Sequence, residues 1–123
     1  MDYEQFCGLK PEKQEILYET IEPLELKARL DAGETLQIID IREPHEKAIA
    51  KFPGAKSMPL GQVKRRSSEF DPSIDTVFIC KIGTRSVFAI RALRETGYDG
   101  KIFNLADGIN GWARDVDKSL PRY

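Results

Sequence analysis

The stretch VFICKIGTRSVFAIRALRETGY, residues 77–98, decides the fold. It begins inside TVFIC (76–80), the strongest strand candidate of the chain, and contains SVFAIRALRET (86–96), the strongest helix candidate. One face of that helix is predicted to carry Val87, Ala89, Ile90 and Leu93, with Arg91, Arg94 and Glu95 pointing away and Gly97 as the cap. A buried strand that leads through a short loop into an amphipathic helix is typical of a parallel α/β sheet.

The same alternation extends to both ends of the chain. Further strands are predicted at 17–21, 36–41, 55–60 and 101–105. Helices are predicted from Pro23 to a stop at Gly33, within 43–50 and from 107, while 60–70 is helical at best. We therefore predict an α/β three-layer domain, in which a central parallel β-sheet has helices on both faces.

Length and composition fit a single domain of an ordinary globular protein. The chain has 123 residues, of which 41% are hydrophobic and 32% charged, and a net charge of −1. Residues 1–16 are interpreted as a tail or linker remnant and 17–123 as the domain. The balanced charge and the lack of a long apolar run indicate neither a nucleic acid nor a membrane as partner.

The cysteine count indicates free thiols. The two cysteines, Cys7 and Cys80, lie far apart in sequence and form no disulfide framework, which predicts a reducing compartment, the cytoplasm. With a single histidine the chain cannot fill a tetrahedral Cys/His zinc site. Cys7 is interpreted as a bystander in preference to a resolving thiol.

The segment CKIGTRS (80–86) carries the predicted chemistry. Cys80 ends a strand, Gly83 allows a tight turn, and the helix that follows presents unpaired N–H groups. Such a loop can form an anion nest, to which Lys81 and Arg85 add positive charge. Surroundings of this kind stabilise a thiolate, so Cys80 is predicted to be a nucleophile instead of a buried structural cysteine.

The loop length distinguishes two chemistries. Four residues, Lys81, Ile82, Gly83 and Thr84, separate Cys80 from Arg85. Cysteine phosphatases use a similar loop that is one residue longer, wide enough for a phosphoryl group. The shorter loop favours the transfer of a single sulfur atom, and a phosphatase or arsenate reductase stays as the weaker alternative.

Several other polar residues can be explained by structural as well as functional roles. Asp40 and Arg42 follow a predicted strand, and a structural ion pair there has the same weight as a direct role in the site. His45 is interpreted as an exposed residue and not as a general base. The basic run 64–66 is interpreted as a solvated helix face as readily as a docking surface for an acidic partner.

Three segments together resemble the rhodanese domains: IIDIREPHEKAIAKFPGAKSMPL (38–60), the opening stretch 77–98 and IFNLADGINGW (102–112). The resemblance implies that Cys80 carries a persulfide, that Lys81, Ile82, Gly83 and Thr84 cradle its outer sulfur, and that Arg85 closes the loop. It implies that Asp40 and Arg42 mainly organise the site. The chain departs from many stand-alone relatives at Ala50-Lys51, where those have Gly-His.

The two ends are similar to the segments that bracket the C-terminal rhodanese domain of MoeB/ThiF-like sulfurylases, namely DYEQFCG (2–8) and VDKSLPRY (116–123). That resemblance implies sulfur from thiosulfate or a cysteine desulfurase. It also implies delivery to a ubiquitin-like sulfur carrier, activated by an upstream adenylating domain, in molybdopterin or thiamine biosynthesis. No cofactor beyond the covalent persulfide is expected, and no bound ATP or zinc. A non-catalytic interaction module on the same scaffold is the remaining alternative.

Overall fold

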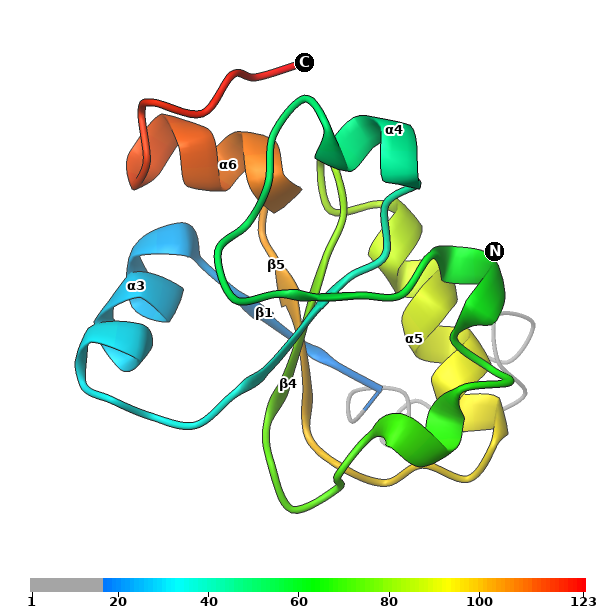
Figure 1. Cartoon of the computed structure of the whole chain (residues 1–123). Helices are drawn as coiled ribbons and strands as arrows, with labels where there is room; N and C mark the ends of the chain where they lie inside the picture. The colour runs from blue at the N-terminus through cyan, green and yellow to red at the C-terminus, as the bar shows by residue number, and fades with distance from the viewer. Residues whose placement is uncertain (1–16) are drawn as a thin grey trace, which may run out of the picture.

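The computed structural model describes residues 17–123. The predicted tail and Cys7 lie outside this part of the chain. Five parallel strands form one sheet in the order β1-β5-β4-β2-β3, of which Figure 1 labels β1, β5 and β4. The strands are β1 (Glu19–Ile21), β2 (Gln37–Asp40), β3 (Lys56–Ser57), β4 (Thr76–Ile79) and β5 (Ile102–Leu105). The predicted central parallel sheet is confirmed.

Helices cover both faces of the sheet. On one face α3 (Pro23–Asp31) contacts α6 (Gly108–Asp115), and on the other α5 (Arg85–Glu95) contacts the 3₁₀ helix η1 (Leu60–Gln62). The connections contain the short helix α4 (Pro44–Lys47) and a second 3₁₀ helix, η2 (Ser67–Glu69). The three-layer architecture is therefore as predicted, whereas the weakly amphipathic segment 60–70 forms only single 3₁₀ turns.

The pleat of β4 divides the core between the two faces. Val77 and Ile79 belong to the apolar cluster under α3 and α6, whereas Phe78 and Cys80 belong to the cluster under α5. Successive strand residues point to opposite faces, so a strand buried on both sides supplies both cores. Cys80 continues this alternation, which places its thiol on the face covered by α5.

Local signals set the ends of α3 as predicted. Pro23 is the first helical residue, and Glu22 and Glu25 form a reciprocal capping box. Gly33 follows the helix with a φ of +81°, a conformation that glycine adopts without strain. No helix among residues 17–123 is both long and apolar enough to cross a membrane.

Arg94 is not among the buried residues of the core, but its side chain is not fully exposed either. Its guanidinium is partly buried and donates to the carbonyl oxygens of Leu17 (2.9 Å), Tyr98 (2.9 Å) and Gly100 (2.7 Å). Helical periodicity sorts residues by face, but it does not show where a long side chain ends. In the first turn of α5, Ser86 takes the buried position, whereas Val87, predicted on the apolar face, is half-buried.

Candidate active site

The thiol of Cys80 lies beneath the loop between β4 and α5. Its Sγ accepts a hydrogen bond from the Gly83 N–H at 3.0 Å, and the Ser86 Oγ lies 3.6 Å away. The residue is 1% exposed, whereas Ile82 on the outside of the loop is 52% exposed. The thiol is therefore buried, and in this structure the predicted cradle consists of one loop amide, that of Gly83.

A polar network inside the molecule fixes the shape of the loop. The Asn104 side chain on β5 donates from Nδ2 to the Gly83 carbonyl at 2.9 Å, and its Oδ1 accepts a hydrogen bond from the Ser86 hydroxyl. Asn104 and Ser86 are both buried. Because Gly83 has a φ of +95° and is held through its carbonyl, its N–H points at the sulfur.

Helix α6 supports the loop from its other side. The Ile109 N–H donates to the Cys80 carbonyl at 2.8 Å, and the Asn110 N–H donates to the Lys81 carbonyl at 3.1 Å. The first turn of α6 approaches so closely that a Cβ at Gly108 would lie 2.3 Å from the Cys80 carbonyl oxygen. These contacts use two N–H groups that the start of a helix otherwise leaves unpaired.

The Arg85 guanidinium points to a carboxylate and not to the sulfur. It forms two parallel hydrogen bonds with Glu46 of α4, each 2.6 Å long. The pKa of Arg85 is raised, mainly by these bonds to Glu46 and also by the negative charge of that carboxylate, against the opposing effect of burial. The pair therefore ties α4 to the start of α5, and the Glu46 carboxylate balances the charge of Arg85.

Asp40 and Arg42 form an ion pair that is almost fully buried. The Arg42 side chain is 0% exposed and donates to both Asp40 carboxylate oxygens, at 3.0 and 2.7 Å. Its other N–H groups reach the carbonyl oxygens of Ala50 (2.7 Å) and Glu46 (3.4 Å) and the Tyr123 hydroxyl (2.8 Å). With its donors occupied, Arg42 holds α4 and the 48–50 segment to the end of β2, the organising role that the resemblance implies.

The remaining predicted residues lie on the outside of the site. Thr84 is exposed and precedes α5, and the Lys81 ammonium lies 4.9 Å from the centre of the Tyr123 ring. His45 is exposed on α4. Substrate contact by Lys81, Ile82, Gly83 and Thr84 stays a prediction, as do the assigned roles of Cys80 and Arg85.

Sequence reasoning missed several residues that build the site. Glu46 binds Arg85 at the end of the loop, and Tyr123 in turn binds Glu46. Asn104 binds the Gly83 carbonyl and the Ser86 hydroxyl. A carboxylate in the predicted helix 43–50 and a polar residue inside the apolar strand IFNL were the available signals. Tyr123 had none, because only the tertiary fold brings it to α4.

The ion pair of Arg85 and Glu46 predicts a loss of stability in acid. Hydrogen bonds from Arg85 lower the pKa of Glu46 from 4.5 to about 2, against the opposing effect of burial. An acid with a lowered pKa stabilises the fold above its ordinary pKa and loses that contribution as the pH falls toward its folded value. We expect Glu46→Gln to be less stable than the unmodified chain by about 2 kcal/mol at pH 7, and this difference to disappear between pH 4.5 and 2.

Chemical denaturation of both proteins at several pH values measures this difference. Glu69→Gln is the matched control, because Arg66 lowers the pKa of Glu69 to about 2 as well, but at an exposed position. Solvent screens an exposed pair, so the control should show a clearly smaller difference. A difference for Glu46→Gln that stays constant from pH 7 to pH 2 would contradict the assigned pair.

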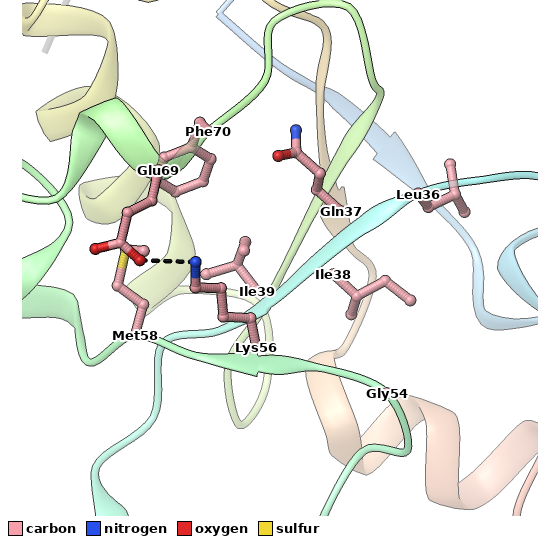
Figure 2. A pocket seen from close by; sticks show the side chains of 9 residues that line it. All are labelled: Leu36, Gln37, Ile38, Ile39, Gly54, Lys56, Met58, Glu69 and Phe70. Carbon is pink, nitrogen blue, oxygen red and sulfur yellow. Dashed lines mark ion pairs between the residues drawn. The ribbon is translucent and has the colours of Figure 1, made fainter.

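A separate cavity lies beside β2 and β3, as Figure 2 shows. Its volume is about 200 Å³, and Lys56 and Glu69 form an ion pair of 2.7 Å at its side. The lining residues are Leu36, Gln37, Ile38, Ile39, Gly54, Lys56, Met58, Glu69 and Phe70. None of them belongs to the thiol loop, so this cavity is not part of the candidate site. Within residues 17–123, no three His, Cys, Asp or Glu side chains are grouped to hold a metal ion.

Comparison with known proteins gives consistent matches. The family model described as "Rhodanese-like domain" matches residues 22–115. The chain is 32% identical over 127 residues to a probable adenylyltransferase/sulfurtransferase, MoeZ, from Mycobacterium tuberculosis, which covers 100% of this chain and 32% of MoeZ. It is 38% identical over 89 residues to a sulfurtransferase from Allochromatium vinosum, covering 72% of this chain and 82% of that protein.

The fold comparison agrees with the sequence comparison. A crystal structure of a rhodanese-like domain protein from Staphylococcus aureus superposes with a TM-score of 0.71 at 27% identity, covering 85% of this chain and 98% of that one. The chain spans about a third of the length of MoeZ and most of the length of the other two proteins.

Proposed function

The chain belongs to the rhodanese-like domain family, and from this premise we propose that it is a sulfurtransferase that carries sulfane sulfur as a persulfide on Cys80. The observation that carries the proposal is the Gly83 N–H, which lies 3.0 Å from the Cys80 sulfur at the start of α5. An N–H donor aimed at a sulfur at the start of a helix stabilises negative charge on that sulfur. The same charge is present on the outer atom of a persulfide.

The transfer takes two steps through one covalent intermediate. With thiosulfate, the Cys80 thiolate attacks the outer sulfur, an S–S bond forms to Cys80, and sulfite leaves with the electron pair of the old S–S bond. In the second step a thiophilic acceptor attacks the outer sulfur of the persulfide, and the Cys80 thiolate leaves. With cyanide as acceptor the product is thiocyanate. Since the sulfur is held covalently, neither step needs a resident cofactor.

Because Cys80 is buried, we propose that the loop above it moves when sulfur is loaded. Because the residue is 1% exposed, a donor reaches the sulfur only when the loop around Ile82 moves outward. Ile82 and Thr84 are exposed and pack little, and Gly83 accepts a wide range of backbone angles. The network from Asn104 and α6 then returns the loop to the position in which the Gly83 N–H binds the charged sulfur.

The natural donor and acceptor are proposed by class. Thiosulfate or a protein persulfide, such as that of a cysteine desulfurase, supplies the sulfur. The relative MoeZ is named as an adenylyltransferase as well as a sulfurtransferase. We therefore infer an acceptor that a separate adenylating domain activates, a ubiquitin-like sulfur carrier of molybdopterin or thiamine biosynthesis, in the reducing cytoplasm.

Mass spectrometry of the intact protein tests the proposal. After incubation with thiosulfate and removal of excess donor, we expect the mass to rise by one sulfur atom, located by peptide mapping on the fragment that contains Cys80. Cyanide should then remove the added mass and release an equal amount of thiocyanate. A chain that gains no sulfur from thiosulfate or from a desulfurase persulfide would instead be an interaction module.

A further inference from the structure

The Tyr123 hydroxyl connects the two charged pairs of the site. It accepts a hydrogen bond from Arg42 Nη1 at 2.8 Å and donates one to Glu46 Oε2 at 2.9 Å. Arginine can only donate and an ionised carboxylate can only accept, so the hydroxyl proton is directed at Glu46. Burial raises the pKa of Tyr123, which keeps that proton in place at neutral pH. The hydroxyl thus continues a hydrogen-bonded chain from Asp40 to Arg85.

The backbone of Tyr123 is held against the thiol loop as well. The Asn110 side chain donates to the Tyr123 carbonyl at 3.2 Å and accepts from the Tyr123 N–H at 3.3 Å. The backbone N–H of the same Asn110 donates to the Lys81 carbonyl at 3.1 Å. The Lys81 ammonium in turn lies 4.9 Å from the centre of the Tyr123 ring. Tyr123 is therefore joined to both ends of the loop, to Lys81 by these contacts and to Arg85 through Glu46.

We propose that Tyr123 is a positioning residue for sulfur loading, whose hydroxyl orients Glu46 and thereby holds Arg85 at the end of the thiol loop. This inference rests on the proposed sulfurtransferase function. Tyr123 makes no hydrogen bond to Cys80, so its effect passes through Glu46. The hydroxyl is the acting part because it alone reaches the carboxylate that binds Arg85.

Tyr123→Phe tests the role of the hydroxyl while keeping the ring beside Lys81. We expect the second-order rate constant for loading of Cys80 by thiosulfate to fall about tenfold, measured well below the unfolding temperature. Tyr98→Phe is the matched control, because its hydroxyl bonds the Asp71 carbonyl at 3.2 Å before β4, at the opposite end of the sheet. This control should load at the unmodified rate.

A double-mutant cycle distinguishes positioning from general stabilisation. A structural role would lower the free energy of unfolding but leave the loading rate per folded molecule unchanged. If Tyr123 acts through Glu46, the double variant Glu46→Gln/Tyr123→Phe loads no slower than Glu46→Gln alone. Multiplied effects of the two substitutions, or a Tyr123→Phe rate equal to the unmodified rate, would overturn the inference.

The test also covers a variant that does not fold and an unmodified chain that does not load sulfur. If Tyr123→Phe does not fold, Glu46→Gln alone takes its place, because the hydroxyl acts only through that carboxylate. Slower loading per folded molecule by Glu46→Gln supports the inference, and an unchanged rate overturns it. Failure of the unmodified chain to load at all would overturn the proposed function together with this inference, whereas loading without any effect of Tyr123 overturns the inference alone.

Discussion

Cys80→Ser is expected to lose sulfur loading by a factor of at least about 10³, with the fold retained. The serine hydroxyl does not ionise near neutral pH, so it cannot attack the outer sulfur of thiosulfate. The smaller side chain fits beneath the loop, where the Gly83 N–H can donate to its oxygen and the Ser86 Oγ can accept from its hydroxyl. We therefore expect the free energy of unfolding to change by no more than about 1–2 kcal/mol.

The second cysteine of the chain supplies the control for that experiment. Cys7→Ser keeps Cys80 and should load and discharge sulfur at the rate of the unmodified protein, as the interpretation of Cys7 as a bystander requires. Both variants are compared by mass after thiosulfate treatment and by thiocyanate release. An added sulfur atom that persists in Cys80→Ser, or that is lost in Cys7→Ser, would move the reactive thiol away from Cys80.

The sheet and its central crossover could be predicted because their signals are local. The apolar run TVFIC can be buried only between two layers, and the periodicity of 86–96 leaves one apolar face to cover it. Gly33 and Pro23 set the ends of α3 through backbone angles that belong to the residue itself. The position of Cys80 at a strand end followed from the same local pattern.

The supports of the loop could not be predicted, because they depend on side chains from distant segments. Glu46 occurs in a short charged helix, where an exposed position was as consistent with the pattern as the buried one observed. Asn104 interrupts an apolar strand, yet periodicity does not identify its partners, Ser86 and Gly83. Arg94 shows the same limit, since it binds the carbonyl oxygens of Leu17, Tyr98 and Gly100, which lie outside α5.

The three supports act on different parts of the loop. Asn104 holds the middle of the loop through the Gly83 carbonyl, α6 holds its first residues, and Glu46 holds its last residue, Arg85. In the proposed reaction the outer residues must move for loading, and attachment at these three points would limit that motion to the segment around Ile82. The proposed cycle would then combine an accessible sulfur during transfer with a fixed N–H donor afterwards.

Gly108→Ala should remove the support from α6 and is expected to lower the free energy of unfolding by about 3 kcal/mol or more. The added Cβ would lie 2.3 Å from the Cys80 carbonyl oxygen and 2.5 Å from the Lys81 carbonyl carbon, both backbone atoms that cannot rotate away. Relief requires α6 to retreat, which breaks the hydrogen bond of 2.8 Å from Ile109 to Cys80. Sulfur loading per folded molecule should therefore fall as well.

Gly33→Ala separates this steric effect from backbone strain. Gly33 has a φ of +81°, beyond the +57° of Gly108, but a Cβ there would meet nothing within 4 Å. Its substitution adds only the cost of a left-handed conformation, about 1 kcal/mol, and leaves the thiol loop untouched. Denaturation and thiosulfate loading of both variants measure the difference. Because the two sites share the positive φ, any larger loss at Gly108 reports the close packing of α6 on the loop, and equal losses would show that this packing does not hold the loop in place.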